Sequence, residues 1–96
     1  MSPSKRFQWD EAKNRQNIQR RGISFKQAAL VFDDPKRIER VDNRQDYGEE
    51  RIAVIGRSAG RILYVVYTWR GNARRIISAR KATKDERQIY LSRIHP

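Results

Sequence analysis

The sequence predicts an α+β fold, in which two N-terminal helices and one C-terminal helix cover one face of an antiparallel four-stranded sheet. A short additional strand at the N-terminus is possible. Three observations lead to this prediction: helical apolar spacing over residues 11–32, strand-like segments separated by turns over 37–81, and a capped helix after residue 83. Short connections make successive strands antiparallel. The 96 residues form a single domain, 1–96.

The first helix is predicted over residues 11–21. Before it, residues 7–9 alternate apolar and polar side chains, which suits a very short strand or an anchored extended segment. Asp10 is placed to cap the helix through its carboxylate. Gly22 suits the left-handed position that ends it.

A second helix is predicted over residues 25–32, with Ser24 as its N-cap. Its apolar residues repeat at helical spacing and so share one face. These residues are Phe25, Ala28, Ala29 and Phe32. Pro35 ends the helix, because the residue before a proline is pushed out of the helical region.

The remaining chain predicts four strands and a helix. The strands are residues 37–42, 51–56, 62–69 and 74–81. The third is β-branched and aromatic on both faces, which is typical of a central strand. Gly71-Asn72 suits a two-residue hairpin turn. Thr83 and Glu86 form a capping box at the start of the last helix, which extends to about residue 94.

Positive charge is concentrated in the second half of the chain. The whole chain has a net charge of +11, but residues 1–50 contribute 11 − 9 = +2 and residues 51–96 contribute 11 − 2 = +9. A half with this imbalance repels itself unless its partner is a polyanion or an acidic protein surface. The alternative is that the basic surface only serves solubility.

Several functional classes are excluded by composition. The chain has no cysteine, so it has no disulfide, no cysteine-bound zinc and no thiol nucleophile. Its single histidine, His95, cannot form a histidine-cluster metal site. No apolar run approaches the roughly 18–20 residues that span a bilayer, and no leader is recognisable. We therefore expect a cytoplasmic protein without membrane contact, cofactor or metal.

The strand over residues 74–81 carries the strongest chemical signal. With regular alternation, Arg74, Ser78 and Arg80 share one face, while Arg75 and Lys81 share the other. Guanidinium groups bind phosphate oxygens in a bidentate manner, and two of them along a strand can hold a phosphate. The alternative is a basic edge strand whose charges block edge-to-edge pairing with another sheet.

Other candidates have a competing structural interpretation. Arg57 ends a strand beside a glycine, where it can meet a ligand or remain a solvated arginine. Tyr67 and Trp69 share a strand face and can either line a site or belong to the core. Glu86 and Tyr90 are spaced for one helix face, either bordering a cleft or only capping and packing.

Ordered segments of the chain resemble the BrnT family of bacterial toxins. They are residues 7–13, 22–25, 28–35, 49–51, 55–58, 65–68 and 76–83, followed by Glu86 and Tyr90. One departure is Arg20-Arg21-Gly22, where many relatives have Lys-His-Gly. The resemblance implies a RelE-like fold and a ribonuclease toxin of a type II toxin–antitoxin module. It also implies a BrnA-type antitoxin as partner, through which alone the toxin meets operator DNA.

From this resemblance we expect metal-independent RNA cleavage that inhibits translation and growth. Arg57, Tyr67, Arg80, Lys81 and Glu86 are the predicted catalytic residues, and Lys13, Arg75, Ser78 and Tyr90 are the predicted substrate-binding residues. Arg57 and Arg80 would hold the phosphate, Lys81 or Glu86 would move the proton, and Tyr67 or Tyr90 would position a reacting group. The alternatives are a non-catalytic nucleic-acid-binding protein and a corepressor that acts only with its antitoxin.

Overall fold

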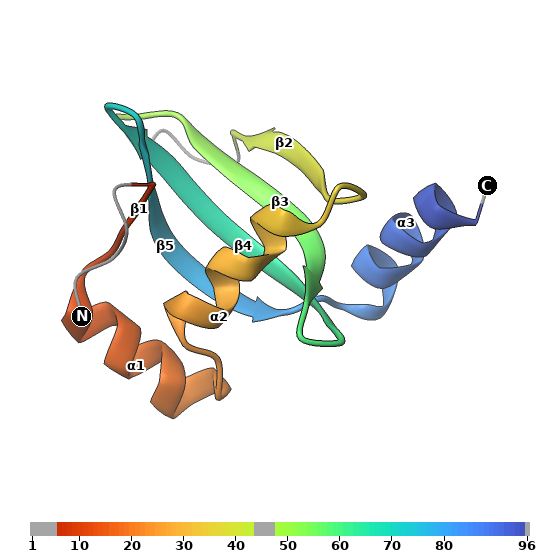
Figure 1. Ribbon diagram of the computed structural model, residues 1–96, viewed down its shortest axis with the longest axis horizontal. Helices are drawn as coiled ribbons and strands as arrows, with labels where there is room; N and C mark the ends of the chain where they lie inside the picture. The colour runs from red at the N-terminus through yellow and green to blue at the C-terminus, as the bar shows by residue number, and fades with distance from the viewer. Residues whose placement is uncertain (1–5, 44–47, 96) are drawn as a thin grey trace.

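A computed structural model of the protein describes residues 6–43 and 48–95, and shows three α-helices, one 3₁₀ helix and a five-stranded sheet in this part of the chain (Figure 1). The strands are β1 (Phe7–Gln8), β2 (Ile38–Asp42), β3 (Arg51–Ser58), β4 (Arg61–Arg70) and β5 (Ala73–Lys81). The helices are α1 (Glu11–Arg21), α2 (Phe25–Ala29), η1 (Leu30–Asp33) and α3 (Lys84–Ile94). The sequence therefore predicted the α+β class and the order of the elements correctly.

The sheet is mixed, whereas the prediction centred on four antiparallel strands. Strands β2 to β5 form the predicted antiparallel meander, and the sheet order is β1-β5-β4-β3-β2. The possible N-terminal strand is present as β1, but it pairs parallel to β5, with Phe7 opposite Arg74 and Gln8 opposite Arg75. A hairpin forces two strands to be antiparallel, but β1 and β5 are far apart in the sequence and no hairpin connects them, so a parallel arrangement is allowed.

The second predicted helix divides in two. The α-helix begins with the predicted Ser24 cap, which forms a capping box with Gln27, but it ends at Ala29 and continues as the 3₁₀ helix η1. Asp34 then takes an extended backbone (φ −85°, ψ 112°), as required before Pro35. The tighter turn carries the chain out of the helix toward β2.

The core lies between one face of the sheet and the layer formed by α2 and η1. The helical side contributes Ile23, Phe25, Ala28, Val31 and Phe32, and the sheet contributes Val54, Leu63, Val65, Tyr67, Ile76 and Ala79. Gly56 permits a close approach here, because a Cβ at this position would lie 3.0 Å from Val31 Cβ and 3.2 Å from Arg37 Cβ. The segment after η1 is thereby packed tightly against β3.

Helix α3 does not join this layer, which corrects the expectation that all helices cover one face. Its residues Glu86 and Ile89 border a hollow together with Ile55 and Tyr64. Those two strand residues alternate with core residues, so they belong to the opposite face. Figure 1 shows α1 and α3 at opposite ends of the molecule. The predicted capping box of Thr83 and Glu86 is present.

A β-bulge changes the faces of β5 from those predicted. Val66 pairs with Ser78 but Tyr67 pairs with Ile76, so Ile77 is an extra residue. Arg74, opposite Trp69, therefore shares the core face. The expectation that Arg74, Ser78 and Arg80 share one face is wrong, because the extra residue reverses the alternation beyond it.

We expect the Asn17→Ala change to lower the free energy of unfolding by about 1–3 kcal/mol, because it leaves buried carbonyl groups without a donor. The buried Asn17 amide donates to Ile23 O (2.8 Å) and to Ala79 O (3.0 Å), and so joins α1 to the turn before α2 and to β5. Urea unfolding measures this difference. Gln16→Ala, an exposed change on the same helix, is the control. Equal stability of the two variants would contradict this role.

Candidate functional site

The residues that the sequence singled out do not meet at one point. Tyr67 lies on the core face, toward the Gly71 end of β4. Arg57 and Lys81 lie at the opposite end of the sheet, bordering the same hollow. Arg80 and Glu86 form a pair, and Tyr90 contacts Asp34. Arg75 and Ser78 lie opposite Thr68 and Val66 of β4, on the face of the sheet away from the core. Lys13 is exposed on α1.

Arg80 and Glu86 hold each other tightly. The Nη1 and Nη2 atoms of Arg80 donate to the two carboxylate oxygens of Glu86 at 2.7 and 2.9 Å. The Arg80 guanidinium also lies 4.1 Å from the centre of the Tyr64 ring. The hydrogen bonds from Arg80, aided by the Thr83 amide, hold the pKa of Glu86 below its ordinary value of 4.5 despite partial burial. In this arrangement both residues act to fix the start of α3.

Asp34 joins α3 to the rest of the domain. Its Oδ2 accepts hydrogen bonds from Tyr90 Oη (2.5 Å) and from the Arg57 amide (2.9 Å), and its Oδ1 accepts one from the Lys36 amide (2.9 Å). Burial raises the pKa of Asp34, but these hydrogen bonds and the Arg57 charge outweigh it and hold the pKa below 3.8. Burial, followed by the bond to Asp34, raises the pKa of Tyr90.

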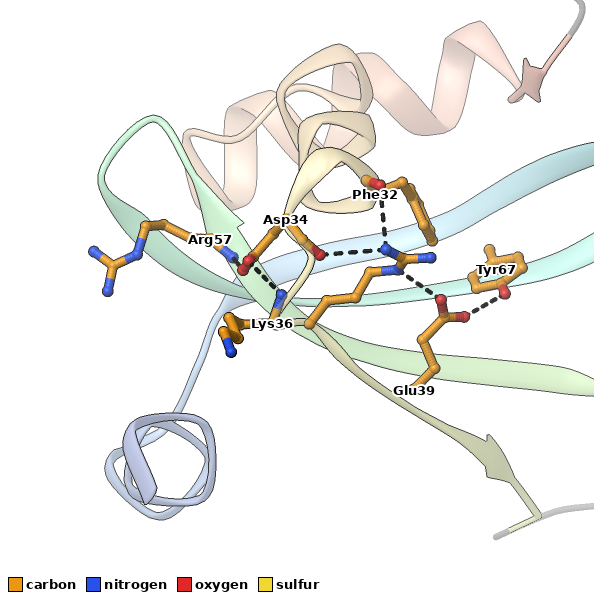
Figure 2. Close-up of polar contacts among 7 residues, drawn as sticks. Phe32, Asp34, Lys36, Glu39, Arg57 and Tyr67 are labelled. Atoms are coloured by element: carbon orange, nitrogen blue, oxygen red, sulfur yellow. Dashed lines mark hydrogen bonds and ion pairs between the residues drawn. The ribbon is translucent and has the colours of Figure 1, made fainter. Parts of the chain in front are cut away.

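A third carboxylate, Glu39, lies where solvent can reach it. Tyr67 Oη donates to Glu39 Oε1 (2.5 Å), and Arg37 Nε donates to Glu39 Oε2 (2.7 Å). Arg37 Nη1 in turn donates to the carbonyl oxygens of Phe32 (3.3 Å) and Asp34 (3.2 Å). Figure 2 shows Glu39 and Tyr67 pointing toward one another, while the Arg57 side chain points away from both. About a quarter of the Glu39 side chain is exposed (26%).

Arg74 places a further positive charge beside Tyr67, which donates to this carboxylate. Its guanidinium lies 4.4, 5.4 and 4.7 Å from the ring centres of Phe32, Tyr67 and Trp69. Its buried Nε has no hydrogen-bond partner among the described residues. Burial and then the bond to Glu39 raise the pKa of Tyr67, whereas Arg74 opposes this shift. We call Arg37, Glu39, Tyr67 and Arg74 the Glu39 centre.

The Glu39 centre combines the groups that acid–base chemistry on a phosphate diester requires. A solvent-accessible carboxylate is held in one orientation by two donors, so it can accept a proton without first reorienting. Arg74 and Arg37 supply positive charge that can stabilise a phosphate gaining negative charge. Trp69, 46% exposed, lies edge-on to Tyr67 at 5.7 Å and offers a ring surface to an unpaired base.

At the other end of the sheet, four cationic side chains border a second hollow. They are Arg57, Arg61, Lys81 and Arg87, and the hollow has a volume of about 380 Å³. We call this site the basic hollow. It contains no acidic residue in its lining. Of the predicted catalytic residues, the structure brings Arg57 and Lys81 together here.

Sequence reasoning missed five of these residues as functional candidates. Glu39 and Arg37 belong to an edge strand and the turn before it, and only the strand register places Glu39 next to Tyr67. Regular alternation groups Arg74 with Ser78 and Arg80 because it does not foresee the bulge, and Arg61 follows a turn without any motif. Arg87 carries no local signal at all. The role of such hydrophilic side chains cannot be predicted until it is known how the strands pair and where α3 packs.

No group of three or more His, Asp or Glu side chains that could hold a metal ion occurs within residues 6–43 and 48–95. No helix in those same ranges is long and apolar enough to cross a membrane.

Comparison with known proteins gives one family. Residues 9–86 match the model of a family described as the ribonuclease toxin, BrnT, of type II toxin–antitoxin systems. The match covers most of the chain. It includes the whole Glu39 centre and three of the four cationic residues of the basic hollow, and it ends just before the fourth, Arg87. No curated protein matches the chain significantly.

Stability should fall in acid, because Asp34 and Glu86 both have a pKa below the ordinary values of 3.8 and 4.5. A carboxylate with a depressed pKa stabilises the folded state above its unfolded pKa and loses this contribution as pH falls through the folded pKa. We therefore expect the free energy of unfolding to drop from about pH 5 downward. Glu86→Gln should be less stable than the wild type near neutral pH and should show a shallower decline, as measured by urea unfolding. An unchanged slope would contradict the Arg80–Glu86 contribution.

Proposed function

The chain belongs to the BrnT family of ribonuclease toxins of type II toxin–antitoxin systems, and from this premise we propose that it cleaves RNA at the Glu39 centre without a metal ion. The observation that carries the proposal is the exposed Glu39 carboxylate, held at 2.5 Å by Tyr67 and at 2.7 Å by Arg37. A base, a positive charge for the phosphate and an aromatic surface for a nucleobase all lie within this one area.

Glu39 acts as the general base in the proposed reaction. Its carboxylate accepts the proton of a ribose 2′-hydroxyl, and the 2′ oxygen attacks the adjacent phosphorus. The bond from phosphorus to the 5′ oxygen then breaks. The proton held by Glu39 passes to the departing 5′ oxygen, directly or through water. The products are a 2′,3′-cyclic phosphate and a 5′-hydroxyl end, and no water is consumed.

Arg74 stabilises the phosphate as its negative charge increases. Its guanidinium is fixed among three rings, so little reorganisation is needed when the charge develops. Tyr67 is 2% exposed and has a raised pKa, which suits a positioning residue that keeps its proton and holds Glu39 in place. Trp69 stacks on a base next to the scissile phosphate.

The arrangement predicted from sequence, with Arg57 and Arg80 holding the phosphate and Lys81 or Glu86 moving the proton, is the competing site for the same reaction. We favour the Glu39 centre because Glu86 accepts three hydrogen bonds, two of them from its pair with Arg80 and one from the Thr83 amide. Glu39 accepts two, and its side chain is more exposed, at 26% against 19% for Glu86. The pKa of Glu86 is also lowered by this pair, which weakens it as a base.

The remaining parts of the proposal concern the cell. RNA cleavage by this protein inhibits translation and growth in the cytoplasm, and an antitoxin of the BrnA type neutralises it. The strongly basic second half, with a charge of +9 from residues 51–96, favours an acidic antitoxin segment as well as RNA. Binding of the two then overlaps, which provides a simple means of inhibition.

The decisive experiment incubates the purified protein with total RNA in EDTA and maps the new ends. The wild type should give fragments with 5′-hydroxyl ends. Glu39→Gln, which keeps the shape but cannot accept the proton, should lower the cleavage rate by about a hundredfold or more. Glu50→Gln is the matched control, because it removes the same charge from an exposed glutamate outside the centre.

Glu86→Gln distinguishes the two sites in the same assay. Retained cleavage by Glu86→Gln and loss with Glu39→Gln support the Glu39 centre. The reverse result would transfer the chemistry to the Arg80–Glu86 pair. Intact RNA after incubation with folded wild-type protein, with or without ribosomes, would instead indicate a binding protein or a corepressor.

A further inference from the structure

The basic hollow is assembled from four elements that are distant in sequence. Arg57 comes from the end of β3, Arg61 from the start of β4, Lys81 from the end of β5 and Arg87 from α3. Gly60, in the β3–β4 turn, also lines the hollow. Because Arg87 belongs to α3, the shape of the hollow depends on how α3 packs, and the hydrogen bond from Tyr90 to Asp34 holds this helix in place.

The charges of the basic hollow are poorly compensated within the protein. No ion pair joins Arg61, Lys81 or Arg87 to an acidic side chain in the part of the chain that the structure describes. Arg57 lies over the Tyr90 ring at 5.7 Å, and its charge helps to lower the pKa of Asp34, whose carboxylate already accepts three hydrogen bonds. Four cations gathered in this way repel one another and favour a bound anion.

The basic hollow is separated from the Glu39 centre both along the strands and across the sheet. Tyr67 pairs with Ile52 and Glu39 pairs with Val54, so Arg57 lies three to five residues further along β3. At about 3.3 Å per residue, this distance is roughly 10–17 Å along the strand. Arg57 also follows Gly56, which faces the helical layer, so the Arg57 side chain leaves the opposite face of the sheet. A group bound in the hollow cannot therefore be the phosphate that reacts at Glu39. The segment from Asp34 to Glu39 connects the two sites, since it contacts the Arg57 amide at one end and Tyr67 at the other.

We propose that the basic hollow is a second RNA subsite, which binds backbone phosphates several nucleotides away from the bond that is cut. The inference rests on the proposed RNA cleavage and adds a requirement on its substrate. Guanidinium groups dominate the lining, and they match phosphate oxygens in a bidentate manner. The volume of about 380 Å³ suits one or two phosphate groups of a single strand rather than an RNA duplex.

A minimum substrate length follows from the separation. A stacked strand advances by about 3.4 Å per nucleotide, so about three to five nucleotides span the distance between the two sites. Short oligonucleotides reach only the Glu39 centre, whereas a single strand of about ten nucleotides reaches both. The substrate is therefore an extended single-stranded RNA and not a dinucleotide.

The test measures binding of 2′-O-methyl RNA, which lacks the attacking hydroxyl and cannot be cut. Strands of about ten and about three nucleotides are titrated by fluorescence anisotropy at several salt concentrations. The variant is the double change Arg61→Gln and Arg87→Gln. The control is Arg15→Gln with Arg20→Gln, which removes the same charge from exposed positions on α1.

We expect the hollow variant to bind the ten-nucleotide strand about tenfold more weakly than the control variant. The slope of log affinity against log salt should become shallower by about 1.4, because two phosphate contacts to a single strand are lost. Binding of the three-nucleotide strand should be the same for both variants.

Equal binding of the ten-nucleotide strand by the two variants would overturn the proposal. Equal RNA binding together with weakened inhibition by the antitoxin would assign the hollow to an acidic antitoxin segment instead. If the hollow variant lost the same affinity for the three-nucleotide strand as for the ten-nucleotide strand, the hollow would bind the reacting phosphate itself. There would then be no second subsite. Because the probe cannot be cleaved, a protein that fails to cut RNA overturns the proposed function without affecting this result.

Discussion

The carboxylate of Asp34 is the interaction on which the arrangement of both candidate sites depends. It accepts a hydrogen bond from Tyr90 of α3 and another from the Arg57 amide of β3, at the point where η1 gives way to β2. The same backbone segment gives a carbonyl to Arg37, which holds Glu39. One ionised side chain thus links the helix that borders the basic hollow to the strand that carries the proposed base.

Close packing supports this junction. The absence of a side chain at Gly56 lets Val31 and Arg37 approach β3 within ordinary contact distance. A methyl group there would force the segment after η1 outward. The orientation of Glu39 therefore depends on a glycine on the neighbouring strand, so that the core and the proposed active centre cannot be treated as independent parts of the molecule.

Excess positive charge is handled in two different ways in the two regions. Near Glu39, Arg37 is paired with a carboxylate and Arg74 is enclosed by three aromatic rings, so each cation has a defined position. In the basic hollow the cations face solvent with little compensation. The first arrangement suits a reacting phosphate, which needs fixed charges, and the second suits phosphates that only need to be held. In the proposed function, an extended RNA strand would engage both.

The sequence alone determined the class of the longer helices and strands, because caps, glycine turns and β-branched runs are local signals: Asp10, Ser24 and Thr83 cap the helices as predicted. It also placed the positive charge in the second half of the chain. Only the tertiary structure decided which side chains meet. Glu39 and Tyr67 lie 28 residues apart and touch through the register of three strands, and the bulge at Ile77 moves Arg74 to their face. Neither register nor bulge leaves a local pattern, since both arise from how strands pair.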